Sequence, residues 1–252
     1  MLANLPITLD FQPAHDLLRL GRDYDGGYLV SSADVIRTEM LISLGINDDW
    51  SFEEEFSEIK KVPIIAYDGS ISAKYFFKRL MKYSLRFNRP KEIRKRYRTL
   101  INYKKFFNDE KNAHYQKFVG LNSSDPSYIT LSDILKQVSS DKIFMKIDIE
   151  GSEYRLLDTL LEKSDRLTGV AIEFHDCDLN LAKIEEFIRS FDLKLVHVHA
   201  NNFGPIRLDD KLPLTLELSF SKYADSFTEL ILPHPFDMPN NPFRSEITLS
   251  IS

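Results

Sequence analysis

The stretch Lys142-Ile-Phe-Met-Lys-Ile-Asp-Ile-Glu-Gly-Ser-Glu153 decides the fold, because it joins the clearest strand of the chain to the start of a helix. Residues 142–149 include five apolar side chains, Ile143, Phe144, Met145, Ile147 and Ile149, as expected for a strand of a parallel sheet. Gly151 permits a tight turn, and residues 154–161 carry apolar side chains at helical spacing. A strand that runs into a helix in this way is part of a βαβ unit.

The same alternation of short apolar runs and helical patterns extends over most of the chain. We expect strands at residues 40–45, 62–67, 118–121, 142–149, 169–174, 193–199 and 214–220. No helical pattern separates the last two runs, so that pair is expected to be antiparallel, since parallel strands need a long crossover. The pattern predicts an α/β fold of the Rossmann-like class I methyltransferase type, with seven mostly parallel strands and an antiparallel last strand.

Composition indicates one globular unit with an uneven distribution of charge. The 252 residues carry a net charge of −5 and a single cysteine, Cys177, which excludes an internal disulfide. Residues 70–114 hold fourteen Lys or Arg and only three acidic residues. We interpret the chain as a single methyltransferase domain, residues 1–252, with an N-terminal cap segment at residues 1–39 and a basic, helical insertion at residues 70–114 between the second and third strands.

Targeting signals are not evident in the sequence. The first residues, MLANLPITLDFQ, lack the basic start and the apolar run of a signal peptide. No apolar run approaches the roughly 20 residues that span a bilayer. A cytoplasmic protein is therefore expected.

Polar residues that directly follow the predicted strands should form the ligand site, because ligands of open α/β sheets bind at this edge. Gly45 permits a close approach to a ligand, and Asp68, at the next strand end, could accept hydrogen bonds from ribose hydroxyls. Because Gly45 is not part of a G-x-G-x-x-G motif, S-adenosylmethionine is favoured over NAD. The predicted cofactor-binding residues are Gly45, Asn47, Asp48, Asp68, Gly69, Asn122 and Asp148.

The segment Lys146-Ile-Asp-Ile-Glu-Gly-Ser-Glu153 resembles the K-[IV]-D-[VI]-E-G-[AS]-E signature of FkbM-type methyltransferases. Further segments agree with that family in order along the chain: residues 22–28 (RDYDGGY), 43–45 (SLG) with 51–53 (SFE), 172–175 (IEFH) and 199–202 (HANN). The resemblance implies an S-adenosylmethionine-dependent O-methyltransferase. The basic segment departs from the family pattern, because it is longer than the usual link.

Methyl transfer to a hydroxyl requires that the acceptor oxygen lose its proton, through a general base or with the help of a metal. His175, His199 and Asp148 are the candidate catalytic residues, since imidazole and carboxylate groups accept protons. Asp148, Glu173 and His199 end three strands and could together bind Mg²⁺ or Mn²⁺. Alternatively, Asp148 bonds helix amides and Glu173 pairs with a lysine.

We therefore expect methylation of a sugar or nucleotide-linked sugar in polysaccharide or natural-product biosynthesis. No nucleic-acid partner is expected from the negative net charge, and a homo-oligomer is left open. Two alternatives remain: a binding module that uses the basic insertion to hold nucleic acid or an anionic membrane, and an NAD-dependent oxidoreductase.

Overall fold

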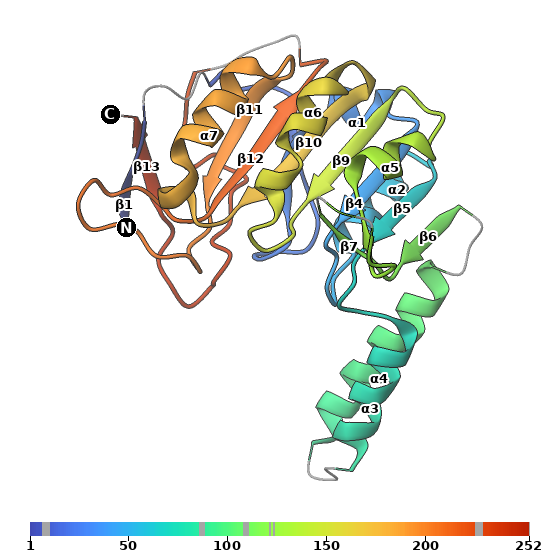
Figure 1. The fold of residues 1–252 in the computed structure, drawn as a ribbon. Helices are drawn as coiled ribbons and strands as arrows, with labels where there is room; N and C mark the ends of the chain where they lie inside the picture. The colour runs from blue at the N-terminus through green and yellow to red at the C-terminus, as the bar shows by residue number, and fades with distance from the viewer. Residues whose placement is uncertain are drawn as a thin grey trace.

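The computed structural model describes residues 1–6, 11–85, 89–107, 111–120, 122, 124–224 and 229–251. Within them, a seven-stranded central sheet has the order β11-β12-β10-β9-β4-β5-β6 (Figure 1). Its strands are β4 (Met40–Leu44), β5 (Ile64–Tyr67), β6 (Asn112–Tyr115), β9 (Ile143–Ile147), β10 (Leu167–Phe174), β11 (Lys194–Ala200) and β12 (Leu216–Ser221). Strands β10, β9, β4, β5 and β6 pair in parallel, whereas β12 is antiparallel to both β10 and β11. This is the strand order of the Rossmann-like class I methyltransferase fold, and the predicted fold is confirmed.

Helices cover both faces of the sheet, which explains why its strands are apolar almost throughout (Figure 1). Ile42 and Met145 pack on one face against α5, α6 and α7. Their chain neighbours Leu41 and Phe144 pack on the other face against α1 and α2, as the two-residue period of a strand requires. The helices are α1 (Ser32–Arg37), α2 (Ser51–Ile59), α5 (Leu131–Lys136), α6 (Leu157–Glu162) and α7 (Cys177–Ser190), and two short 3₁₀ helices, η1 (Glu153–Arg155) and η2 (Ser164–Arg166), flank α6.

Small sheets surround the central one. The first strand, β1 (Leu2–Leu5), pairs in parallel with the last, β13 (Thr248–Ile251). An antiparallel hairpin of β2 (Leu17–Leu20) and β3 (Tyr28–Ser31) lies near β10 and β12 and carries Tyr28 into the core under α2. The position of this hairpin matters because the Tyr28 hydroxyl reaches the edge of the sheet where polar side chains gather.

The prediction that residues 118–121 form the third strand of the central sheet was wrong. Phe118–Val119 form β7, which pairs with β8 (Tyr128–Ile129) in a separate two-stranded sheet, and Leu121 lies outside the described residues. The third strand of the central sheet is instead β6, with the sequence NAHY. Since β6 is an edge strand with a single neighbour, it is only partly buried and needs no apolar run.

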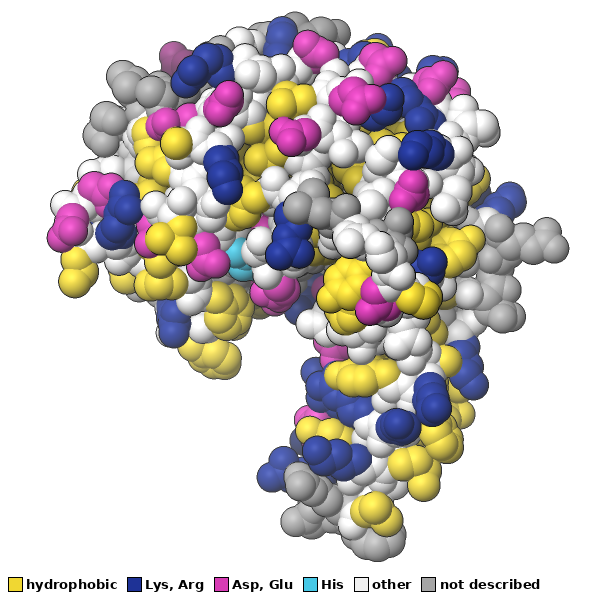
Figure 2. All heavy atoms as spheres, viewed as in Figure 1, with side chains coloured by type: hydrophobic (Ala, Val, Ile, Leu, Met, Phe, Trp, Pro, Cys, Tyr) yellow, Lys and Arg dark blue, Asp and Glu magenta, His cyan; other side chains and the backbone are white. Residues whose placement is uncertain are grey.

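A pair of helices projects from the body between β5 and β6 (Figure 1). We call α3 (Ala73–Ser84) and α4 (Pro90–Phe106) together the arm. Trp50, directly before α2, fixes the base of the arm, because its ring contacts Phe76, Tyr103 and Phe107 at centroid distances of 5.7–6.1 Å. Trp50 is thus a packing residue. Figure 2 shows Lys and Arg side chains along most of the arm.

The start of α2 is bonded to the segment before β3. Residues 51–54 have the S-x-x-E pattern that is typical of a capping box, but none forms here, since Trp50 is the N-cap and Ser51 is the first helical residue. The Ser51 hydroxyl accepts a hydrogen bond from the backbone N–H of Arg22 instead, and thereby ties α2 to the segment before β3. None of the helices in the described part of the chain is long and apolar enough to span a bilayer.

Trp50→Ala is expected to loosen the arm. Truncation of a buried Trp costs about 3–5 kcal/mol of unfolding free energy, because contacts are lost and a cavity remains. Chemical denaturation would measure the loss, and limited proteolysis should show faster cleavage within residues 73–106. Tyr97→Ala, at an exposed aromatic residue of α4, is the control and should cost far less. Equal losses in both variants would contradict the anchoring role of Trp50.

Candidate functional site

The carboxyl ends of β4, β5, β9 and β10 meet around a cavity of about 730 Å³. Three loops supply much of its lining: residues 45–49 after β4, 68–70 after β5, and 148–150 after β9. Glu173, at the end of β10, and His175, just after it, also line the cavity. We call the side formed by Asp148, Glu150, Glu173 and His175 the acidic wall. Lys117 and Arg155 add positive charge to the lining. The cavity therefore lies at the edge of the sheet where the sequence predicts the ligand site.

Gly45 is held in a conformation that no other residue fits. Its φ is +80°, and a Cβ atom built there would lie 1.7 Å from the backbone oxygen of Asp148. The two strand ends are also bonded directly, since the Asp148 N–H donates to Leu44 O at 2.8 Å. Lys146, which is 5% exposed, donates from Nζ to Gly45 O at 3.0 Å. The loop after β4 is thus locked to the loop after β9.

Asp68 holds the same loop from the other side. Its Oδ2 accepts from the N–H groups of Ile46 and Asn47, at 3.1 and 2.8 Å, and its Oδ1 accepts from the Ser70 N–H and hydroxyl. Burial opposes ionisation of this carboxylate, but the four hydrogen bonds outweigh it and lower the pKa of Asp68 below its usual value. These four bonds occupy the acceptor positions of the Asp68 carboxylate. In this structure Asp68 therefore holds the loop after β4, whereas the sequence predicted only that it would accept hydrogen bonds from ribose hydroxyls.

The other predicted cofactor-binding residues divide into two groups. Asn47, Asp48 and Gly69 line the cavity, and Gly69 leaves room for the Phe118 ring, which would lie 2.4 Å from an added Cβ. Asp48 is already paired with two cations of the arm, Arg79 at 2.7 Å and Arg96 at 3.2 Å. Asn122 does not join the site: it is exposed, and its side chain accepts from the Ser124 N–H.

Asp148, Glu173 and Tyr28 form a buried acidic group. The Tyr28 hydroxyl lies 3.3 Å from Asp148 Oδ2 and 3.2 Å from Glu173 Oε2. A hydroxyl has one proton, so at any moment the Tyr28 hydroxyl donates to one of the two carboxyl groups. Burial, with the charge of Asp148 nearby, raises the pKa of Glu173 well above its usual value. Glu173 therefore takes up a proton more readily than an exposed glutamate does.

Lys146 supplies a second buried charge beside this group. Burial opposes its charge, but Glu53 and Asp148 outweigh the burial and raise the pKa of the Lys146 amine. Sequence reasoning gave Lys146 no role in the site beyond pairing with Glu173, although a lysine inside a strand buried on both faces is itself an unusual signal. The lysine holds the Gly45 loop, as described above.

His175 lies against three carboxylates at the mouth of the acidic wall. Its Nδ1 is 3.1 Å from Glu153 Oε1, and its Nε2 is 3.5 Å from Glu150 Oε2 and 3.6 Å from Glu173 Oε1. Burial alone would lower the pKa of His175, but the bond to Glu153 and the charge of Glu173 raise it to about 9. At neutral pH the ring is thus an imidazolium, which cannot accept a proton.

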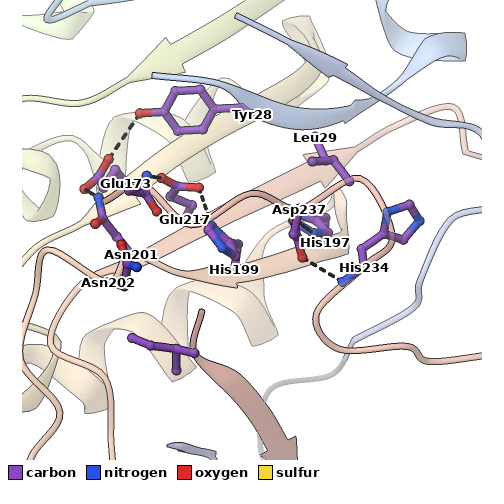
Figure 3. A network of polar contacts seen from close by, with 12 residues as sticks. Tyr28, Leu29, Glu173, His197, His199, Asn201, Asn202, Glu217, His234 and Asp237 are labelled. Carbon is purple, nitrogen blue, oxygen red and sulfur yellow. Dashed lines mark hydrogen bonds and ion pairs between the residues drawn. The ribbon is translucent and has the colours of Figure 1, made fainter. Parts of the chain in front are cut away.

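His199 belongs to a separate buried network (Figure 3). Its Nδ1 lies 2.9 Å from Glu217 Oε2, and its Nε2 lies 3.2 Å from Glu246 Oε1. Burial opposes protonation of His199, but these carboxylates raise the pKa of its imidazole well above the usual value. Figure 3 also shows Asp237 between His197 and His234, and Asn201 bonded to Glu173.

The structure does not support the predicted metal set of Asp148, Glu173 and His199. Both ring nitrogens of His199 face carboxylates of its own network, which leaves none for a cation bound by Asp148. Among the described residues, the ligand atoms close enough to share a cation belong to Asp148, Glu150 and His175, within 4.8 Å of one another. The protonated His175 already balances this acidic group, because an imidazolium is a cation in the same place.

No family model matches the chain, and no curated protein sequence matches it. Among solved structures it is similar to a precorrin-6y C5,15-methyltransferase from Geobacter metallireducens, with 12% identity and a TM-score of 0.39 over 75% of this chain and 86% of that one. It is also similar to an rRNA methylase from Streptococcus thermophilus, with 10% identity and a TM-score of 0.39 over 75% of this chain and 90% of that one. Likeness at this level carries no inference about activity. The fold assignment rests on the strand order, and the resemblance to FkbM-type enzymes stays a prediction.

Gly45→Ala should destabilise the protein by more than its positive φ alone explains. Gly151→Ala is the matched control, because Gly151 has a φ of +91° but its added Cβ would meet only Asp176 Oδ2, at 3.9 Å. We expect a loss of about 1 kcal/mol for Gly151→Ala and at least about 2 kcal/mol for Gly45→Ala, measured by chemical denaturation. If the two variants lose the same stability, the contact between the loops is not tight.

The raised pKa of His175 predicts a pH-dependent contribution to stability. A group with a folded-state pKa of about 9 and an ordinary value of 6.5 stabilises the fold fully below pH 6.5, and this contribution is lost as the pH rises through 9. The unfolding free energy of the wild type should therefore fall more between these pH values than that of His175→Gln. His15→Gln, at an exposed histidine, should retain the wild-type pH dependence. Identical profiles for all three proteins would refute the raised pKa.

Proposed function

We propose that the protein is an S-adenosylmethionine-dependent O-methyltransferase of the FkbM type, acting on a hydroxyl of a sugar or a nucleotide-linked sugar. The observation that carries the proposal is the convergence of the Gly45 loop and the Asp148–Glu173 carboxyl pair on one cavity. This cavity lies at the edge of the sheet where ligands of open α/β folds bind. The strand order, with β12 reversed between β10 and β11, supports a methyl donor over a dinucleotide.

The charge of the cavity fits a donor that carries a sulfonium cation. Asp148 and Glu150 line it close to the end of β9, and Glu173 lies at the end of the neighbouring strand. Arg155 and Lys117 at the rim suit the carboxylate of the donor's amino-acid part, because their side chains are cations. S-adenosylmethionine supplies an electrophilic methyl group at this place when it is bound.

The donor's adenosine is expected at the loops after β4 and β5. Asp68 keeps the 45–49 loop in place through two backbone N–H groups. A ribose hydroxyl would bond to Asp68 by taking the place of the Ser70 hydroxyl on Oδ1, which is the one side-chain donor among its four partners. Asn47 lines the cavity beside this position and has a φ of +43°, which a short polar side chain tolerates.

Asp148 is the proposed general base. Burial raises the pKa of its carboxyl, which strengthens it as a base at neutral pH. Among the residues that the structure describes, no donor bonds to the second oxygen of Asp148, Oδ1, so that oxygen can face the acceptor hydroxyl. The acceptor oxygen loses its proton to Asp148 as it gains the methyl group. Tyr28 orients the carboxylate through Oδ2.

His175 acts as a cation in this proposal and not as the base. The imidazolium offsets the charges of the neighbouring carboxylates, Glu150, Glu153 and Glu173. A bound Mg²⁺ or Mn²⁺ at Asp148, Glu150 and His175 would first require that His175 lose its proton, because only the neutral ring is a ligand. The proposed mechanism therefore needs no metal, and turnover should survive exhaustive chelation.

Asp148→Asn should abolish most turnover without preventing donor binding. Removal of a general base lowers kcat by about 10²–10⁴-fold, whereas an amide still fills the same space. Asp158→Asn, at an exposed carboxylate of α6 that does not line the cavity, is the matched control and should keep kcat within about threefold. Calorimetry with S-adenosylhomocysteine and turnover on sugar acceptors would measure the two effects.

A wild-type protein that binds NAD but neither S-adenosylmethionine nor S-adenosylhomocysteine would contradict the methyltransferase proposal itself. An Asp148→Asn variant with wild-type turnover would contradict only the assignment of the base. Thermal unfolding with each compound tests the first of these outcomes, because a ligand that binds the folded state raises the melting temperature.

A further inference from the structure

A second cavity, of about 430 Å³, lies between the arm and the start of α2. One wall is a single face of α4, formed by Lys91, Arg94, Lys95 and Arg98. Lys91 and Lys95 are four residues apart, as are Arg94 and Arg98, so their side chains project from the same side of the helix. All four are exposed. The opposite wall contains Trp50, Ser51 and the acidic residues Asp48, Asp49 and Glu54.

The acidic residues of this cavity already have partners. Asp48 pairs with Arg79 and Arg96, and Asp49 pairs with Arg22 at 2.9 Å. Glu54 accepts a hydrogen bond from the Trp50 indole N–H at 3.1 Å, and burial raises the pKa of its carboxyl. Asp48, Asp49 and Glu54 therefore offer little negative charge to the lysines and arginines of α4 that face them.

The four cations of α4 have no ion-pair partner within the described part of the chain. No carboxylate there lies within salt-bridge distance of Lys91, Arg94, Lys95 or Arg98. The acidic residue nearest in sequence, Glu92, lies next to Arg96 at 3.8 Å instead. Four cations side by side repel one another, and an anion bound between them would remove that repulsion.

The two cavities adjoin each other. Asp48 and Asp49 line both the cavity of the arm and the larger cavity that contains Asp148. A molecule that occupies both would place one end against α4 and the other near the carboxyl pair. The size of the arm cavity suits a short anionic group, and the acidic residues opposite α4 disfavour a long polyanion that would extend over them.

We infer that the basic face of α4 and the start of α2 form a binding site for the phosphate or pyrophosphate group of a phosphorylated acceptor. Arg and Lys are suited to this group, since guanidinium and ammonium groups form charge-assisted hydrogen bonds with phosphate oxygens. The inference rests on the proposed function in one respect, namely that the anion belongs to the acceptor. The acceptor class is then a pyrophosphate-linked sugar, whose hydroxyl reaches Asp148 while its phosphates remain at the arm.

The test compares two matched double variants of the full-length protein. Lys91→Gln/Lys95→Gln removes two cations from the cavity, and Lys74→Gln/Lys78→Gln removes two exposed cations of α3 that do not line it. Both pairs have the same residue types, the same spacing and the same change of charge. Calorimetry would measure the binding of inorganic pyrophosphate, which is the probe, and of S-adenosylhomocysteine.

Pyrophosphate affinity should fall at least about tenfold in Lys91→Gln/Lys95→Gln and change less than about twofold in Lys74→Gln/Lys78→Gln, because only the first pair loses charge-assisted bonds. Equal losses in the two variants, or no pyrophosphate binding by the wild type, would overturn the inference. Oligouridylate or phosphatidylglycerol vesicles that bind the wild type while pyrophosphate fails to displace them would also overturn it, in favour of RNA or a membrane.

The S-adenosylhomocysteine titration keeps this result separate from the proposed function. If the protein binds pyrophosphate as expected but not S-adenosylhomocysteine, the anion site stands and the methyltransferase proposal fails. If it binds S-adenosylhomocysteine in all three forms and pyrophosphate in none, the methyltransferase proposal stands and the anion site fails.

Discussion

The contact between Gly45 and the backbone of Asp148 is the constraint on which the site depends. It brings the ends of β4 and β9 so close that only a residue without a side chain fits at position 45. The Lys146 amine and the Asp68 carboxylate bond to the same loop from two other directions. Loops are ordinarily the mobile part of a fold, but this one is fixed by three strands. A cavity with rigid walls is the consequence, and rigid placement of reacting groups is what group transfer requires.

Buried charge is the second feature that needs explanation. The Tyr28 hydroxyl contacts both the Asp148 and the Glu173 carboxyl groups. Two ionised carboxylates so close together in a buried place would repel each other strongly. The amine of Lys146 and the imidazolium of His175 together compensate for part of this charge. Because each compensating group is itself held by a carboxylate or a backbone oxygen, the arrangement is stable only as a whole.

The sequence predicted the fold well because the strands are buried on both faces and their apolar runs stand out. It failed at β6, where an edge strand with the sequence NAHY has no such signal. At the site, the strand-end rule identified Gly45, Asp68, Asp148, Glu173 and His175, all of which line one cavity. His199 also ends a strand, but its partners Glu217 and Glu246 come from β12 and the segment before β13, and spacing along the chain does not show such pairing. The protonation of His175 depends on Glu153 in the same way, so the sequence predicted a base where the structure places a cation.

Amide hydrogen exchange with and without S-adenosylhomocysteine tests most directly whether the donor binds beside the contact of Gly45 with Asp148. Slower exchange is expected in residues 45–49 and 68–70, since these loops form the wall against which the donor lies. Exchange in β13, which pairs with β1 outside the central sheet, should not change. If added S-adenosylhomocysteine leaves residues 45–49 and 68–70 unprotected, or protects only the arm at residues 73–106, the donor does not bind at this contact.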